Sequence, residues 1–331
     1  MLQALKVIPI TPFIKTEQEF ILNSTTISPK VIGYLCALCA TIIWSGNFVV
    51  ARGLMDSIPP VALAYWRWLV AILVFIPFAI KPTLKDWQVI RSHLPYLAIC
   101  ALLGVTAFNT LIYIASHSTT AINLSLIAIT FPIFVIILAR LFLSEALSLR
   151  KTLGIVLVIL GVVLLVSKGH IANLMQLTLV KGDGWMLLAS ICFAGYSILV
   201  KHKPQTLSGW SFQFITFVLG LIFLLPFYLW ETQHSTFSIT EISLSGLGAI
   251  LYIGILASLI AFIVWGKAIE LIGPTQSSVT YYTLPVFSGL AAYLFLDEQI
   301  TAMHFISMSL IITGVLVAAL NSKRSTKVKS L

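Results

Sequence analysis

Long apolar runs, separated by short polar or Pro- and Gly-containing breaks, make up most of the chain from residue 31 onward. A helix that crosses about 30 Å of hydrocarbon needs about 20 apolar residues. Runs such as 152–166 do not alternate as barrel strands do, and backbone groups in lipid must bond within their own segment, so we expect helices. The ten predicted spans are 31–51, 61–80, 94–115, 119–140, 152–168, 183–200, 209–230, 244–268, 274–295 and 302–321.

The composition agrees with a membrane protein that has little mass outside the bilayer. Of 331 residues, 59% are hydrophobic and only 9% are charged, against about a quarter in soluble domains. A water-soluble domain would not have enough polar residues to cover its surface, and a disordered chain would have far fewer apolar ones. We therefore predict an all-α integral membrane protein.

The net charge of +9 indicates membrane topology rather than nucleic-acid binding, because the basic residues lie between the apolar runs. With the N-terminus in the cytoplasm, 16 Lys and Arg fall on the cytoplasmic side and 3 on the other. This bias predicts both termini in the cytoplasm and an even number of spans. Eight spans would also be even, but would merge segments that have clear breaks between them.

Residues 1–30 form a polar extension without the uninterrupted apolar core of a signal peptide, and we expect it in the cytoplasm with the basic tail 322–331. The four Cys lie inside apolar runs, where we expect packing rather than disulfides or metal binding.

The chain contains an internal repeat. Three groups of residues match at a constant separation of 153 positions, and a further set upstream matches at 149. The matching segments are Thr130–Phe134 with Thr283–Phe287, Leu141–Glu145 with Leu294–Glu298, Gly161 with Gly314, Asn47 with Tyr196, and Pro77 with Pro226. The halves are 31–168 and 183–321, joined by a linker over 169–182.

Each half has five predicted spans, and an odd number gives the two halves opposite orientations in the membrane. Two inverted five-helix repeats around a central cavity are an architecture for alternating access, because the same unit seen from two sides gives two conformations of similar energy.

Each half resembles an EamA-type unit of the drug/metabolite transporter superfamily. The resemblance rests on Trp44–Phe48 in the first span, Arg67 in the second, Trp265 in the eighth, and Glu145 and Glu298 in the Leu-Phe-Leu-x-Glu sequences. It implies ten helices, a central cavity, and movement of small metabolites across a bacterial inner membrane without ATP hydrolysis. An organellar membrane is the alternative location. Some relatives have an acidic residue before the Pro of the ninth span, but this chain has Leu284 there and Phe131 in the first half, so we do not expect a proton relay at that position.

Polar side chains deep in hydrocarbon are unfavourable unless they face the protein interior. Uncharged amides and phenols in the spans are therefore candidates for solute binding, with hydrogen bonding between helices as the alternative. These candidates are Asn47, Asn109, Tyr113, Asn123, Tyr196, Gln276, Tyr281 and Tyr282.

Arg67 lies within the second span and has two interpretations. It binds a substrate carboxylate, or it reaches the outer interface between Trp66 and Trp68. Trp44 and Trp265 either stack on a solute or pack in the core. Pro132 and Pro285 fall mid-span, where proline frees carbonyls and kinks a helix, and we expect them to shape a cavity or a gate, or to form static kinks.

The sequence contains no pattern for a metal, a cofactor or a nucleotide. The six His are scattered, a phosphate-binding Gly loop is absent, and the repeat mates Glu145 and Glu298 lie on opposite faces in the predicted topology. We predict a secondary transporter, not an enzyme, for small organic solutes such as amino acids, with export favoured. Transport coupled to a proton or another ion is one possibility within this prediction. The alternative function is an intramembrane enzyme that acts on a lipid-linked substrate.

Overall fold

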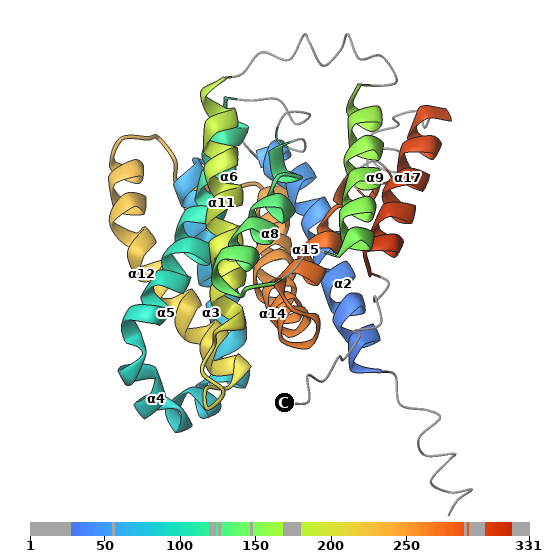
Figure 1. Ribbon diagram of the computed structural model, residues 1–331. Coiled ribbons are helices and arrows are strands. Elements are labelled where there is room, and N and C mark those ends of the chain that lie inside the picture. Colours follow the sequence, from blue (N-terminus) through green and yellow to red (C-terminus); the bar gives the residue numbers. More distant parts are fainter. Residues whose placement is uncertain are drawn as a thin grey trace, which may run out of the picture.

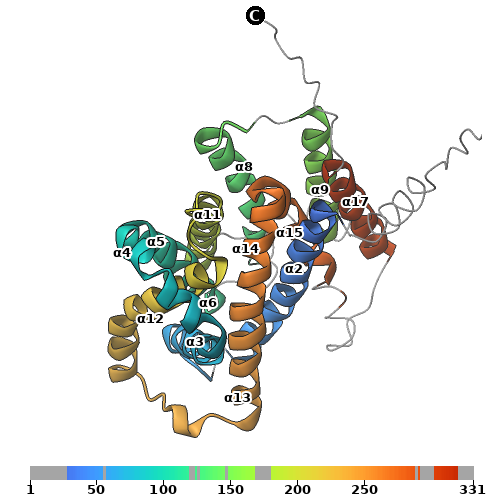
Figure 2. The same ribbon diagram turned by 90° about the horizontal axis from the view of Figure 1, so that it is seen from below.

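The computed structural model describes residues 28–54, 57–118, 124, 127–145, 148–167, 180–287, 290 and 302–319. Those residues form helices and connecting turns, with no strand among them. The helices pack into a bundle, with α9 and α17 together at one side (Figures 1 and 2).

The first half begins with two long helices, followed by a third that changes its winding. The helices are α2 (Pro29–Leu54), α3 (Pro60–Lys85), α4 (Trp87–Ser92), α5 (Leu94–Ala101), the π-helix η1 (Leu102–Ala107), α6 (Phe108–Ser116), α8 (Phe131–Phe142) and α9 (Leu149–Val166).

The second half repeats this order, including a π-helix in its third long helix. The helices are α11 (Lys181–Lys201), α12 (Gly209–Gln233), the short 3-10 turn η2 (Ile239–Glu241), α13 (Leu244–Leu251), the π-helix η3 (Tyr252–Ile260), α14 (Ala261–Ile272), α15 (Pro274–Tyr281) and α17 (Ala302–Ala319). The two π-helices therefore begin at Leu102 and Tyr252, at equivalent points of the two halves.

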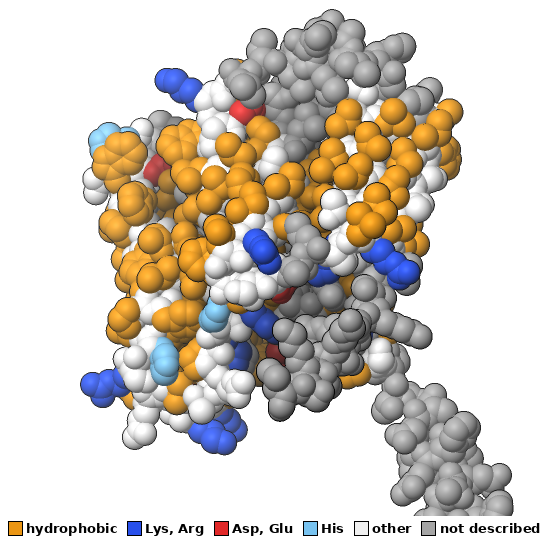
Figure 3. Space-filling view, viewed as in Figure 1, with side chains coloured by type: hydrophobic (Ala, Val, Ile, Leu, Met, Phe, Trp, Pro, Cys, Tyr) orange, Lys and Arg blue, Asp and Glu red, His pale blue; other side chains and the backbone are white. Residues whose placement is uncertain are grey.

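Six helices in the described part are long and apolar enough to cross a membrane: 29–47, 60–85, 94–116, 181–201, 209–233 and 244–272. Two shorter apolar helices, 131–142 and 305–318, accompany them. Hydrophobic side chains cover much of the face in Figure 3, as expected for a surface that contacts lipid.

The two prolines expected to lie mid-span each follow a turn that interrupts the span, and their role in shaping a cavity or a gate stays a prediction. Pro132 lies in the first turn of α8, directly after the turn at Ile129 and Thr130. Pro285 lies in a short helical stretch, 284–287, after the turn at Tyr282 and Thr283. In a first turn proline removes an amide that has no partner within the helix, so these positions end one segment and begin another.

Glycines bring α9 and α17 into direct backbone contact. A Cβ added to Gly154 would lie 2.6 Å from the carbonyl oxygen of Gly314, and one added to Gly161 would lie 2.9 Å from that of Ser307. Because the contacts run from 154 to 161 on one helix and from 314 back to 307 on the other, the two helices are antiparallel. Small residues at both contacts allow this approach, as expected for helices that associate in lipid.

Helices α3 and α12 are also antiparallel, and a carboxylate at the end of each binds the start of the other. Asp86, after α3, accepts hydrogen bonds from the Ser208 amide at 2.9 Å and the Ser211 hydroxyl at 2.7 Å. Glu231, near the end of α12, accepts from the amides of Val61 at 3.1 Å and Ala62 at 2.7 Å. A carboxylate satisfies free amides at a helix N-terminus and interacts favourably with its dipole.

These contacts define the two ends of the bundle. At one end α2 begins and α3 ends beside α4, and we name it the α4 end (Figure 1). At the other end α6 ends at His117 and α3 and α13 begin, and we name it the His117 end.

Candidate functional site

Arg67, on the third turn of α3, has a side chain that is 0% exposed. Its Nε donates to the Ser258 hydroxyl at 2.6 Å, its Nη1 to Oδ1 of Asn109 at 2.9 Å, and its Nη2 to the carbonyl of Ala257 at 3.2 Å. Nη1 also donates to the Tyr113 hydroxyl. The guanidinium is thus held by oxygens from α3's neighbours in both halves of the chain.

The partners of Arg67 are all neutral. Among the described residues the only ion pair is between Lys267 and Glu270, at 3.1 Å, and it lies elsewhere. A guanidinium stays charged in proteins, and a buried charge without a counter-ion costs several kcal/mol. The site therefore has one buried positive charge with neutral hydrogen-bond acceptors around it, which is suited to an anionic group.

Of the two interpretations of Arg67, the one that takes it to the outer interface is wrong. The side chain points into the bundle, and Trp68 beside it is also 0% exposed, with Nε1 donating to the Val105 carbonyl at 3.2 Å. Partners on α6 and η3 satisfy the guanidinium within the protein, so it gains nothing by reaching for headgroups.

The two π-helices place the partners of Arg67. Ser258 lies in η3, where its hydroxyl also donates to the Ile253 carbonyl at 2.9 Å. Asn109 follows η1, and its Nδ2 donates to the Gly104 carbonyl at 3.4 Å. A π-helix widens the helix by one residue and leaves carbonyls available to side chains, and such segments are frequent at functional sites.

Trp44 and Trp265 meet in an aromatic cluster next to this site. Their ring centroids are 5.3 Å apart, and Phe193 packs on both. The indole of Trp44 donates to the Ala257 carbonyl at 2.9 Å, the same oxygen that Arg67 binds. The indole of Trp265 donates to the Ser197 hydroxyl at 3.3 Å. Both tryptophans are thus core residues in this conformation; Trp44 shares a hydrogen-bond acceptor with Arg67, and Trp265 packs on Trp44.

Asn47 and Tyr196, the repeat mates, both lie in the interior but have different partners. Oδ1 of Asn47 accepts from the Tyr113 hydroxyl at 3.4 Å and so joins the Arg67 network. The Tyr196 hydroxyl donates to Oε1 of Gln213 at 3.2 Å, and Nε2 of Gln213 donates to the Phe262 carbonyl at 3.1 Å. The first half thus has a charged network and the second half a neutral one.

The other expected site residues are distributed over the molecule. Tyr281 and Tyr282 are buried, and the Tyr282 hydroxyl has no hydrogen-bond partner in the described part of the chain. Gln276 lies at the start of α15, where its Oε1 accepts from the Tyr34 hydroxyl at 3.3 Å near the α4 end, away from Arg67. Asn123 lies outside the described residues.

Ser258 and Gln213 belong to the networks, although the sequence analysis did not single them out. Gln213 carried the same signal as Asn47, an amide inside an apolar run. Ser258 carried none, because serine in a membrane helix commonly bonds its own backbone.

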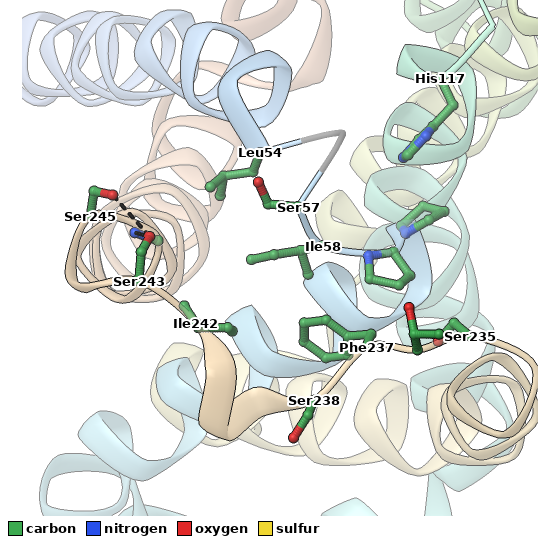
Figure 4. A pocket seen from close by; sticks show the side chains of 14 residues that line it. Leu54, Ser57, Ile58, His117, Ser235, Phe237, Ser238, Ile242, Ser243 and Ser245 are labelled. Carbon is green, nitrogen blue, oxygen red and sulfur yellow. Dashed lines mark hydrogen bonds between the residues drawn. The ribbon is translucent and has the colours of Figure 1, made fainter.

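Two pockets open at the two ends of the bundle. The His117-end pocket, of about 660 Å³, lies between the start of α3, the end of α6 and the 235–246 segment. His117, Ile58 and Phe237 point toward its centre, and serine hydroxyls line its rim (Figure 4). The α4-end pocket, of about 760 Å³, lies between the 200–213 segment and α14.

Glu145 ties two helices together at a connection. Its Oε2 accepts from the Thr275 hydroxyl at 2.7 Å, which ties the end of α8 to the start of α15 at the α4 end. Its repeat mate Glu298 lies outside the described residues. No group of three His, Cys, Asp or Glu in the described part is placed to hold a metal ion.

Comparisons with known proteins match both halves of the chain to one family. The sequence profile of the EamA-like transporter family matches residues 31–167 and again 180–320. An uncharacterized transporter of Archaeoglobus fulgidus is 30% identical over 295 residues, which cover 85% of this chain and 95% of that protein. The uncharacterized transporter YyaM of Bacillus subtilis is 25% identical, over 86% of this chain and 93% of its own.

Two further similarities concern a named exporter and a solved structure. A protein of Streptantibioticus cattleyicolor named as a probable terminal-alkyne amino-acid exporter is 25% identical, over 85% of this chain and 91% of its own. A solved structure titled "Crystal structure of protein" superposes with a TM-score of 0.66 at 18% identity and covers 86% of this chain and 96% of its own, which is a likeness of fold.

Proposed function

The chain belongs to the EamA-like transporter family, and we propose that it is a secondary active transporter, not an enzyme, that exports small organic solutes with a carboxylate, such as amino acids. It is a multi-pass membrane protein. Beyond the family, we propose the class of solute, export as the direction of transport, and alternating access as the mechanism. The observation that carries it is the buried guanidinium of Arg67, which has four oxygen partners and no carboxylate among the described residues.

A solute carboxylate would complete the charge balance at Arg67. It would replace Oδ1 of Asn109 or the Ala257 carbonyl, each of which accepts one hydrogen bond from Arg67. Charge-assisted, two-pronged bonds between guanidinium and carboxylate are stronger than bonds to neutral oxygens. Tyr113 and Asn47 lie next to this position and would contact the remainder of the solute.

Alternating access is supported by the reciprocal contacts between the halves. Moving each residue by 153 positions to its repeat mate turns the contact of Gly154 with Gly314 into the contact of Ser307 with Gly161. A two-fold axis in the membrane plane requires such an exchange. Asp86 and Glu231 make equivalent contacts at opposite ends. Because Arg67 is fully buried, a solute reaches it only when helices separate at one end.

Within this proposal ten spans form two inverted repeats, 31–168 and 183–321, in a cell inner membrane. Residues 1–30 and 322–331 and the α4 end face the cytoplasm. An intramembrane enzyme is the second candidate, and it would need titratable groups gathered at one depth; around Arg67 the described partners are instead hydroxyls, an amide and a carbonyl. Coupling to a proton or another ion is open within the proposal.

The test is counterflow in liposomes. Purified protein is reconstituted, loaded with an unlabelled metabolite mixture, and given one labelled solute at a time, with and without a pH gradient. We expect exchange of at least one solute that has a carboxylate. We expect no exchange of the analogue in which an uncharged amide replaces that carboxylate. Failure of a broad panel to exchange under every gradient would contradict the carrier function.

A further inference from the structure

The α4-end pocket has a chemistry that the Arg67 site does not explain. Its wall is formed by the end of α11, the 201–209 connection, the first turn of α12 and the inner face of α14. At about 760 Å³ it has room for a small metabolite with its water. It is open to solvent at the end where we place the cytoplasm.

Three lysines and one glutamate line this pocket. Lys267 and Glu270 form an ion pair at 3.1 Å, and both side chains are about half exposed, at 47% and 59%. Lys203 Nζ donates to the carbonyl of Leu207, and at 3.4 Å to that of Pro204, so its ammonium is fixed at the rim. With three lysines and one glutamate the pocket has an excess of positive charge, and such an excess between low-dielectric walls raises the local concentration of anions.

Burial and the neighbouring charges act on the pKa of Lys203 in opposite directions. Burial lowers its pKa, and the nearby carboxylates Glu270 and Asp86 oppose that shift, with Lys267 acting the other way. Asp86 is occupied by the Ser208 amide and the Ser211 hydroxyl.

Gln213 forms the floor of the pocket. It lines the pocket although it is only 4% exposed, and it faces Gly266 on α14. A Cβ added to Gly266 would lie 3.0 Å from Nε2 of Gln213, so glycine at this position leaves the space beside the amide open. The amide of Gln213 therefore lines the pocket together with the apolar side chains of Trp210 and Ile263.

A series of buried contacts connects this floor to Arg67. Gln213 binds the Tyr196 hydroxyl, and the Tyr196 ring packs directly on Gly104, where it leaves no room for a Cβ. The Gly104 carbonyl accepts from Asn109, which in turn binds Arg67. The route links a basic entrance to a single buried cation.

We propose that the α4-end pocket is an entrance site that binds the anionic group of the transported solute, a carboxylate or a phosphate, before the solute reaches Arg67. This inference rests on the proposed function. The His117-end pocket, by contrast, has no Lys or Arg among its 14 lining residues. The pocket chemistry is thus asymmetric, and it favours capture from the α4 end and release at the other.

The test compares the apparent affinity for one labelled amino acid from the two sides of the membrane. Everted membrane vesicles present the cytoplasmic face outward, and right-side-out vesicles present the other face. For Lys203→Gln and for Lys201→Gln, which changes an exposed side chain, we expect KM to rise about three- to tenfold in everted vesicles only, with Vmax unchanged. Lys203→Arg retains the charge and should restore KM, and the difference should shrink at high salt.

Lys81→Gln is the matched control, because Lys81 is an exposed lysine at the same end that does not line the pocket. An equal effect of Lys81→Gln, or an equal effect from both sides, would overturn the entrance site. So would unchanged KM in both lysine variants. If wild-type vesicles move none of the solutes, the proposed function fails, whereas unchanged KM in active variants overturns only the entrance site.

A lipid headgroup could supply the same phosphate chemistry, and a second arm separates the two sources. The variants are reconstituted in liposomes of phosphatidylcholine alone and with added phosphatidylglycerol. An effect of Lys203→Gln that persists without anionic lipid supports a solute site. An effect that appears only with phosphatidylglycerol shows that the pocket holds a headgroup and overturns the proposal.

Discussion

Nε of Arg67 on α3 donates to the hydroxyl of Ser258 in η3 at 2.6 Å, and this bond joins the two halves of the chain. Arg67 is the only fully buried arginine among the described residues. The partners come from helices that must move relative to one another if the site opens. Arg67 is thus a candidate both for solute binding and for coupling that binding to helix movement.

Replacing Arg67 with glutamine should abolish the preference for carboxylates. Removing one member of a buried charged pair costs about 2–5 kcal/mol, which corresponds to about 30-fold or more in kcat/KM. Arg67→Lys should retain less than a tenth of the activity, because an ammonium is a point charge that cannot form the two-pronged contact. Counterflow of an amino acid and of its amide analogue measures this effect. Equal losses for both solutes would indicate a structural role.

Tyr196→Phe and Asn47→Ala should change the transport rate without unfolding the protein. Tyr196→Phe removes the donor to Gln213, at a cost of about 1 kcal/mol, and leaves Gln213 free to contact the solute. Tyr34→Phe is the control, because it removes a comparable bond to Gln276 at the α4 end. Rates that respond equally to Tyr34→Phe and Tyr196→Phe would remove the second network from the pathway.

Alanine at Gly154 or Gly314 should lower the thermal unfolding midpoint. Each added methyl would lie 2.6 Å from a carbonyl oxygen of the facing helix, and such overpacking costs about 1–3 kcal/mol. Gly184→Ala is the comparison, since nothing lies within 4 Å of a Cβ there, and it should leave the midpoint unchanged or raise it. Detergent-solubilised protein in a thermal melt gives the measurement, and a stable Gly154→Ala would show that α9 and α17 separate readily.

Asp86→Ala should destabilise the protein at neutral pH and not at acidic pH. Burial opposes ionisation of Asp86, but the bonds from Ser208 and Ser211 and the charge of Lys85 outweigh it and hold its pKa below the usual value. Its stabilisation is therefore present above a pH of about 4 and is lost as the pH falls through the lower folded value. We expect a loss of about 1 kcal/mol at pH ~7 and none near pH ~2. A loss of the same size at both pH values would exclude the carboxylate as the cause.

Single cysteines in place of Glu145 and Glu298 should react with an impermeant thiol reagent from opposite faces of the membrane. This follows from an odd number of spans between equivalent positions of the two repeats. The native cysteines are first replaced by alanine. Labelling of both sites from one face would mean that the repeats are not inverted.

The sequence predicted the helical membrane fold and the family, because both follow from local information. The length of each apolar run, the Gly and Pro breaks and the 153-residue repeat are visible without any contacts. The six long apolar helices confirm the corresponding spans, and the profile matches confirm the resemblance to EamA units.

The tertiary structure decided the surroundings of each polar residue. Whether Arg67 reaches lipid or stays inside depends on whether a neighbouring helix offers oxygens, and Ser258 is distant in sequence. Gln276 looked equivalent to Asn47 but lies at the α4 end with Tyr34, because the break at Pro274 starts a new helix there. Pro132 begins a helix because the chain turns before it. Apolar content fixes which segments enter a membrane, whereas the partners of a buried charge depend on contacts between helices, which no local pattern encodes.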